Sequence, residues 1–405
     1  MPMNTTFLRN VFAWVAICIA LPIMPAKCFA DDGTKTPQRS AVGNDRTGVG
    51  KGIFTKFPGN LKRVPDHAKQ NSYVTGIEAK IVWAELEPAK GKYAWHLIDE
   101  FLAECQRSGK QAAFKFWTVS GKVMSDGQLA RGRGKAGPNV VFENTDTPAW
   151  LFADPQVRRL GGIATPKGKL PYYPVFWDSA YQRHLEEFIA AFARRYDGNS
   201  RIEYIRIGGW QILTNEPSFY GGASEFLVDQ LLANGMDVRG MEKDLKKMRN
   251  LPGNSPYSKA VLQMMDIWFK HFKQTCLGVT VHPPKEKGSF EDVQMQSALG
   301  HKALIMNTGL NEGDKTEMRQ LYRTAHDQHG CKVGWGDLTH VGQHLSRQQL
   351  AAKGHSLWME IAKQAVGSDA DEAYKPAAKI SYLILNSEAL ADEEATKWLV
   401  EHLVE

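Results

Sequence analysis

Short apolar segments alternate with helical ones along most of this chain, and this alternation most constrains its fold. Runs rich in β-branched residues predict strands, whereas apolar residues spaced three and four apart predict helices. Strand-like segments lie at 52–54, 76–82, 111–116, 202–207, 277–281, 303–307, 331–335, 356–361 and 380–385. The segments 181–196 and 393–404 are among the intervening helices. About eight strands alternating with helices predict an α/β fold class, a (β/α)8 TIM barrel with long loop insertions.

The first thirty residues differ from the rest and predict a secretory signal. Arg9 precedes the apolar run 11–24, and small residues at Cys28 and Ala30 follow. The run is short for a membrane span, so we predict cleavage after Ala30. An uncleaved anchor is one alternative, and lipid attachment at Cys28 is another, which the preceding Lys27 disfavours. We expect the mature chain to be periplasmic or secreted, without membrane attachment.

Composition indicates a single globular domain after this segment. Hydrophobic residues make up 43% and charged residues 23% of the chain, values typical of soluble globular proteins. Residues 31–50 lack periodicity and predict a linker, so we assign the barrel domain to 51–405. The net charge of +6 is mildly basic, but lysine and arginine are scattered rather than clustered. Nucleic acid is therefore not an expected partner.

Cysteine usage and motif content predict that the chain needs no cofactor. After cleavage, Cys105, Cys276 and Cys331 would remain, and we interpret all three as structural, with one disulfide bridge left open. No cysteine or histidine cluster has the spacing of metal ligands, and no glycine-rich loop has the phosphate-binding pattern. The sequence does not constrain the oligomeric state.

The tripeptide Asn215-Glu216-Pro217 is the leading candidate for chemistry. It follows the predicted strand 202–207 and the flexible Gly208-Gly209 pair. Barrel enzymes place their catalytic groups beyond the carboxyl ends of their strands, which is where this carboxylate would lie. We therefore predict Glu216 as a general acid/base, although a lone tripeptide of this kind is often an ordinary exposed turn.

Two stretches resemble clan A glycoside hydrolases, especially the β-galactosidase-like family 42 group. These are W-A-E-L-E-P-A-K-G-K-Y-A-W-H-L-I-D (83–99) and W-Q-I-L-T-N-E-P (210–217), and T-P-A-W (147–150) and A-R-R-Y-D-G (193–198) between them are similar to the family's connecting region. The path from Trp210 to Asn215 is one residue longer than in that family, and no late-strand tyrosine matches. The resemblance implies a TIM barrel, a sugar substrate, and a hydrogen bond from Asn215 to the sugar hydroxyl beside the reacting carbon.

Glycoside hydrolysis requires a second carboxyl group. Glu360 lies in the apolar run H-S-L-W-M-E-I-A, interpreted as a strand, where a charge is expensive unless it faces a polar site. Asp337 follows the predicted strand 331–335 and is its rival. We place the nucleophile at Glu360 and leave Asp337 as the alternative; each also has a structural interpretation as a helix-start or turn residue.

Sugar sites combine aromatic platforms with hydrogen-bonding side chains. The segment 118–150 lacks periodicity and is typical of a binding loop or lid. Candidate substrate-binding residues at strand ends or in loops are Trp83, Trp117, Trp150, Trp177, His282, Asn307, Trp335, Asp337 and Trp358, beside Asn215. Any single tryptophan here is more often a core residue.

Together these patterns predict a secreted or periplasmic retaining glycoside hydrolase that acts on a β-linked sugar or polysaccharide by double displacement with two glutamates. The alternatives are a non-catalytic carbohydrate-binding barrel that has lost the pair, and a barrel enzyme of another chemistry. The sequence names neither the sugar nor the choice between exo and endo action.

Overall fold

The structure is a computed structural model. It describes residues 51–57, 61, 64, 66–119, 121–125, 128–129, 140–161, 172–210, 232–236, 251–284, 286–308, 316–336, 355–385 and 390–404. All of these belong to one compact unit, Arg46–Glu405. The predicted signal segment and linker, residues 1–50, lie outside the described residues.

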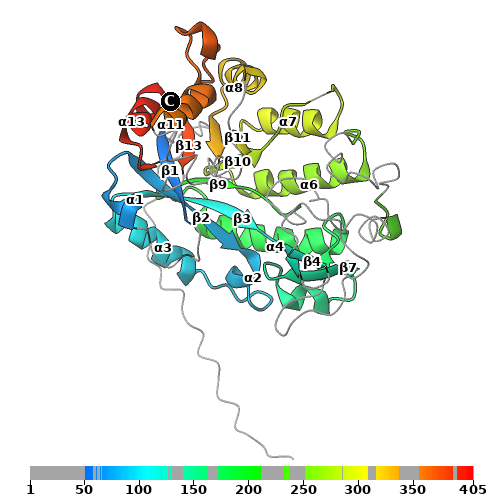
Figure 1. Ribbon diagram of the computed structural model, residues 1–405. Helices are drawn as coiled ribbons and strands as arrows, with labels where there is room; N and C mark the ends of the chain where they lie inside the picture. Colours follow the sequence, from blue (N-terminus) through cyan, green and yellow to red (C-terminus); the bar gives the residue numbers. More distant parts are fainter. Residues whose placement is uncertain are drawn as a thin grey trace, which may run out of the picture. The chain divides into compact units, whose positions relative to one another are not determined.

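Eight parallel strands close into a barrel, as the alternation predicted (Figure 1). Each strand pairs in parallel with its two neighbours, and the first strand closes the barrel by pairing with the last. In spatial order they are β1 (Gly52–Phe57), β2 (Val74–Val82), β3 (Gln111–Trp117), β9 (Ile202–Arg206), β10 (Cys276–Thr280), β11 (Leu304–Thr308), β12 (Val333–Gly336) and β13 (Tyr382–Leu385). The (β/α)8 fold class is therefore confirmed.

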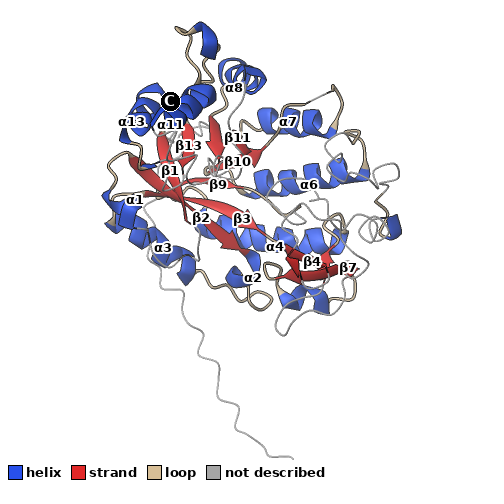
Figure 2. Ribbon diagram, in the orientation of Figure 1, coloured by secondary structure: helices blue, strands red, loops and turns tan. Residues whose placement is uncertain are grey.

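Helices separate the strands along the chain and lie around the barrel (Figure 2). They are α1 (Asp66–Gln70), α2 (Trp83–Leu86), α3 (His96–Arg107), η1 (Ala149–Ala153), α4 (Ser179–Tyr196), α6 (Pro256–His271), α7 (Phe290–Gly300), α8 (Thr316–His329), α11 (His355–Val366), η4 (Glu372–Tyr374) and α13 (Glu393–His402). The predicted strand 356–361 is wrong, because this apolar run lies inside α11.

Local sequence explains why these helices form where they do. In α3, the buried residues Ile98, Phe101, Leu102 and Cys105 recur at helical spacing and face the barrel. Helix α6 begins after Ser255, whose side chain accepts a hydrogen bond from the backbone N–H of Ser258, and has proline at its first position. The amphipathic pattern therefore explains which face of α3 is buried, and the cap explains where α6 begins.

The strands present one face to the helices and the other to the barrel interior. Outward residues such as Ile81, Phe114 and Ile205 join the large core between barrel and helices. A second, smaller core fills the barrel interior with Phe54, Ala113, Tyr204, Cys276, Leu304, Met306, Tyr382 and Ile384. Because strand side chains alternate, residues two positions along from these also point inward.

The long segment after β3 carries structure of its own rather than forming a bare loop. An antiparallel sheet joins β4 (Gly121–Ser125), β5 (Gln128–Leu129) and β6 (Val140–Asn144), and a hairpin joins β7 (Arg159–Gly161) to β8 (Tyr172–Pro174). The prediction that this segment lacks periodic structure is therefore wrong at 121–125, 128–129 and 140–144, where Val140 and Val141 pair with β4.

The three cysteines of the barrel domain are buried free thiols, as expected for structural residues. Burial raises the pKa of Cys105 to about 12 and that of Cys331 to about 11. Within the described ranges, no helix is both long and apolar enough to cross a membrane. The same described residues contain no group of three or more side chains suited to hold a metal ion.

Candidate functional site at the carboxyl end of the barrel

The chain leaves β9 through a fixed Gly208-Gly209 turn. The hydroxyl of Tyr181 in α4 donates to the Gly209 carbonyl at 2.8 Å, and the indole N–H of Trp268 in α6 donates to the Gly208 carbonyl at 2.8 Å. Gly209 has a φ of 128°, a conformation that favours glycine, and an added Cβ would lie 2.7 Å from a Leu185 methyl carbon. Two helices therefore set the direction in which the chain leaves the barrel.

The three predicted polar residues nearest the chemistry lie outside the described residues. The described chain after β9 ends at Trp210, five positions before Asn215, so Asn215 and Glu216 have no described position. Similarly, β12 ends at Gly336 and Asp337 is the next residue. Their roles stay predictions.

A row of three cationic residues lines the inner wall of the barrel near this end. Lys80 of β2 is in register with Lys115 of β3, which is in register with Arg206 of β9. Each alternates with outward-facing core residues, so all three point into the barrel. We call Lys80, Lys115 and Arg206 the cation row.

The Arg206 end of the row is an ion pair buried inside the barrel. Its guanidinium bonds to the Glu78 carboxylate of β2, and both side chains are 1% exposed. The Tyr204 hydroxyl donates to the same carboxylate at 3.3 Å, and burial raises the pKa of that phenol well above its usual range. Farther along the barrel interior, the Tyr382 hydroxyl donates to Glu203 at 2.9 Å. These contacts tie β2, β9 and β13 together.

The Lys80 end of the row is partly open to solvent. Its ammonium lies 2.6 Å from a carboxylate oxygen of Asp146 and 4.4 Å from the centroid of the Trp117 ring. The Lys115 ammonium lies 5.5 Å from the same ring. The Lys80 side chain is 35% exposed, whereas that of Asp146 is 5% exposed. The ammonium of a partly exposed lysine thus contacts both a buried carboxylate and an indole face.

Most of the predicted tryptophans are structural. Trp83 is fully buried, donates its indole N–H to Glu87 at 2.8 Å, and meets Trp150 edge to face at 6.1 Å between ring centroids. Trp150 itself donates to the Glu87 carbonyl. Trp335 is 1% exposed and meets Tyr322 of α8 edge to face at 5.3 Å. The 83–99 stretch therefore joins β2 to α3 and α4 rather than forming a sugar platform.

Other predicted residues are divided between the outer wall and the barrel mouth. Asn307 faces outward, donating to the Val281 carbonyl at 2.8 Å and lying 3.8 Å from the sulfur of Met318 in α8. Half-buried Trp177 donates to the Asn234 carbonyl, and half-buried Trp358 packs against the main core from α11. Among the described strand-end candidates, Trp117 and half-buried His282, two positions beyond β10, follow the inward-facing alternation of their strands.

Glu360 does not end a strand. It lies exposed on α11, where its carboxylate accepts from the Tyr374 hydroxyl at 2.6 Å and from Gln364 at 2.9 Å. The Tyr374 hydrogen bond is the main cause that lowers the pKa of Glu360 below its usual value. The strand-end reason for choosing Glu360 as nucleophile is therefore wrong, because α11 belongs to the helical layer that connects β12 to β13.

Sequence reasoning missed the cation row and its partners. Their signal is charged residues within otherwise apolar strands, in G-I-E-A-K-I-V (76–82), A-A-F-K-F-W (112–117) and Y-I-R-I (204–207). A charge in such a strand is expensive unless it is paired or faces a polar site. The alternation of each segment also places the charge on the face opposite the helices.

No protein-family model and no curated protein sequence matches this chain. Solved structures are similar to this chain to different extents. The catalytic domain of β-amylase from Paenibacillus polymyxa has a TM-score of 0.50 and 13% identity, covering 87% of this chain and 99% of that domain. The β-galactosidase of psychrophilic Marinomonas ef1 has a TM-score of 0.38 and 12% identity over 71% of this chain and 48% of that one. Endo-glycoceramidase II of Rhodococcus sp. has a TM-score of 0.34 and 13% identity over 72% and 73%.

The β-amylase likeness shows a common barrel fold, and the low identity limits it to the fold. Membership of family 42, which the 83–99 and 210–217 stretches resemble, stays a prediction.

Proposed function

We propose that this chain is a glycoside hydrolase that acts on a β-linked sugar or polysaccharide. One observation carries the proposal: β9 and β12 are the fourth and seventh strands of a closed parallel barrel, and a candidate carboxylate follows each of them in the sequence. Because all the strands are parallel, their carboxyl ends surround the same opening. The barrel fold shared with a β-amylase catalytic domain is consistent with this chemistry.

For the catalytic pair we propose Glu216 and Asp337, with Asp337 replacing Glu360. Asp337 directly follows Gly336, the last residue of β12, whereas Glu360 is occupied on an outer helix. In double displacement, the Asp337 carboxylate attacks the anomeric carbon while Glu216 protonates the departing oxygen. Glu216 then takes a proton from a water molecule while the water oxygen attacks the anomeric carbon, which breaks the bond from that carbon to Asp337 and releases the sugar.

The described mouth of the barrel supplies a polar setting for this reaction. The Gly208-Gly209 turn is fixed by two helices, so the segment that leads to Glu216 starts from a defined position. Trp117 and the Lys80 ammonium at the carboxyl ends of β3 and β2 offer apolar and hydrogen-bonding surface. Asn215 is proposed to bond the sugar hydroxyl next to the reacting carbon.

The test is turnover of aryl β-glycosides and polysaccharides by the wild-type chain and four variants. We expect Glu216→Gln and Asp337→Asn to lose at least about a thousandfold in kcat/KM, and Glu360→Gln, the matched control on α11, to retain activity. Azide added to Asp337→Gly should restore turnover with inverted product. Sugar binding without turnover would instead establish the non-catalytic binding barrel, and an inactive Glu360→Gln beside an active Asp337→Asn would reverse the assignment.

We also propose that the chain is exported and cleaved after Ala30. The support is the order of a basic residue, an apolar run and small residues before Asp31. N-terminal sequencing of secreted material should begin at Asp31. Recovery of a membrane-bound chain that starts at Met1 would establish an anchor instead.

A further inference from the structure

The cation row gives the barrel interior a feature that neutral sugar hydrolysis does not require. Neighbouring parallel strands lie only about 4.8 Å apart, so three cations in register on β2, β3 and β9 concentrate positive charge on one wall. Like charges on adjacent strands repel unless anionic groups lie close to them. Glu78 is the anionic group beside the buried Arg206, and Asp146 is the anionic group beside Lys80.

Lys80 differs from Arg206 in its access to solvent. The Arg206 and Glu78 side chains are both 1% exposed, whereas the Lys80 side chain is 35% exposed. An ammonium has three N–H donors, and Asp146 takes one of them at 2.6 Å. The Lys80 end of the row can therefore contact a ligand at the barrel mouth, whereas the Arg206 end is buried.

The Lys80 ammonium is also held in place before any ligand arrives. Asp146 is fixed by the backbone N–H of Ala84, which donates to its carbonyl at 3.0 Å, and by the Thr145 hydroxyl, which donates to its carboxylate at 3.0 Å. The ammonium also lies over the Trp117 ring, 4.4 Å from the ring centroid, as in a cation–π contact. A preorganised charge loses little conformational freedom on binding.

We propose that Lys80, held by Asp146 and Trp117, binds the anionic group of an acidic sugar, either a carboxylate or a sulfate ester. This inference rests on the proposed function for the ligand being a sugar. An ammonium is a point charge that accepts either group, unlike the planar fork of arginine. The chain's net charge of +6 also favours the approach of an anionic polysaccharide.

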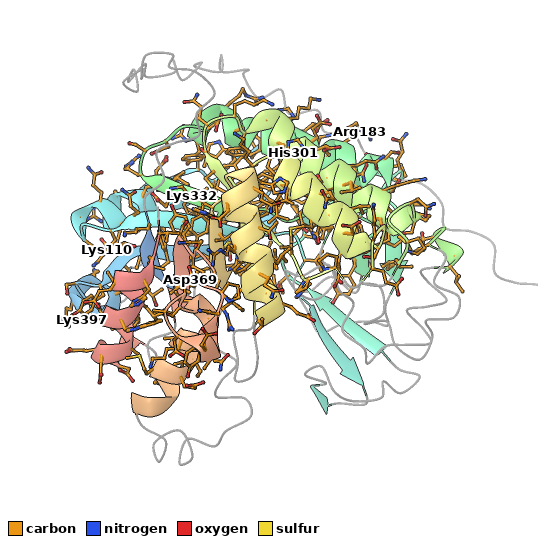
Figure 3. The ribbon with its side chains drawn as sticks, turned by 90° about the horizontal axis from the view of Figure 1, so that it is seen from above. Lys110, Arg183, His301, Lys332, Asp369 and Lys397 are labelled. Atoms are coloured by element: carbon orange, nitrogen blue, oxygen red, sulfur yellow. The ribbon has the colours of Figure 1, made fainter. Side chains whose placement is uncertain are left out.

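The test measures binding by calorimetry to three oligomers of equal length: a galacturonate oligomer, a sulfated galactan oligomer and a neutral galactan oligomer. We expect the wild-type chain to bind at least one acidic oligomer about tenfold more tightly than the neutral one. Lys80→Gln should lower the affinity for the acidic oligomers about tenfold, to that for the neutral oligomer, and should change the affinity for the neutral oligomer much less. The control Lys397→Gln removes an exposed lysine of α13, which is labelled in Figure 3. This control variant should keep the preference for the acidic oligomer.

A second variant separates binding from structural damage. Asp146→Asn keeps an amide oxygen that can accept from the Lys80 ammonium and so hold it in place, but it removes the negative charge that opposes an anionic ligand. Affinity for the preferred acidic oligomer should therefore rise about threefold, and added salt should weaken that affinity more than in the wild type. If the Lys80–Asp146 bridge had only a structural role, both Lys80→Gln and Asp146→Asn would bind the acidic and the neutral oligomers more weakly. Thermal unfolding of each variant checks that the barrel is folded.

The outcomes distinguish this inference from the proposed function. Equal wild-type affinity for all three oligomers, or equal losses for acidic and neutral oligomers in Lys80→Gln, would overturn the inference even if aryl β-glycosides are hydrolysed. Preferential acidic binding that depends on Lys80, without turnover of any substrate, would support the inference and refute the proposed function. The carboxylate and sulfate sources are told apart by which acidic oligomer loses affinity in Lys80→Gln.

Discussion

Removing Arg206 should destabilise the barrel severely, because its partner is buried with it. Glu78 is 1% exposed, and its described partners are the Arg206 guanidinium and the Tyr204 hydroxyl at 3.3 Å. In Arg206→Met, the carboxylate would keep only that long hydrogen bond. Removing one partner of a buried ion pair typically costs about 3–5 kcal/mol in the free energy of unfolding. That loss is a large part of the 5–15 kcal/mol that domains usually have.

The double variant Arg206→Met/Glu78→Leu gives the matched comparison. Replacing both charges with apolar groups removes the uncompensated carboxylate, so much of the loss should be regained. The Tyr204 hydroxyl would then lack its acceptor, which costs about 1 kcal/mol. We therefore expect the double variant to lie within about 2 kcal/mol of the wild type and above the single variant.

Urea unfolding followed by far-ultraviolet circular dichroism measures these differences, with Lys397→Met as an exposed control expected within about 0.5 kcal/mol. A loss below about 1 kcal/mol in Arg206→Met would refute the reasoning, since it would mean that Glu78 is not an uncompensated buried charge. With Glu78→Leu measured alone as well, a loss in the double variant equal to the sum of the two single losses would also refute it, because the pair would then not be coupled.

Three further predictions concern other parts of the molecule. The hydrogen bond to Glu360 is the main cause that raises the pKa of Tyr374 to about 12. Glu360→Gln should therefore move the pKa of Tyr374 back toward its ordinary value of 10 in an ultraviolet difference titration. An unchanged pKa would mean that the hydrogen bond is absent. In Gly336→Ala the new Cβ would lie 2.7 Å from a guanidinium nitrogen of Arg206, so the free energy of unfolding should fall by about 1–3 kcal/mol. In the control Gly300→Ala the new Cβ has nothing within 4 Å, so that substitution should be neutral or slightly stabilising. Equal effects of the two substitutions would contradict this prediction. Iodoacetamide at pH 8 should leave Cys105, Cys276 and Cys331 unmodified in the folded protein and should label all three after unfolding, as measured by mass spectrometry. Rapid labelling of the folded protein at these cysteines would contradict their burial.

The barrel could be predicted from the sequence because its signal is local. Strand alternation and helical spacing repeat from one unit to the next, so an error in one segment does not change the fold class. The segment 356–361 is such an error. A short apolar run is compatible with either a buried strand or a helix, and α11 formed because the run continues to Val366 with helical periodicity.

The site could be predicted only in part, because the side of the barrel wall to which a strand residue points depends on how that strand packs against its neighbouring strands and helices. Trp335 and Asn307 do lie at strand ends, as predicted, but the phase of β11 and β12 turns both toward α8. A shift of one residue in that phase would exchange the inward and outward sets. Strand-end position alone therefore does not separate a sugar platform from a core residue.

The sequence by itself determined the alternating units, the apolar outer faces of the strands and the candidate carboxylates after β9 and β12. Only the tertiary structure decided that Lys80, Lys115 and Arg206 form one row, that Asp146 holds Lys80, and that Glu360 lies outside the barrel. The physical reason is that barrel closure fixes register between strands far apart in the chain. The energy of a charge depends on which partners that register brings within a few ångströms.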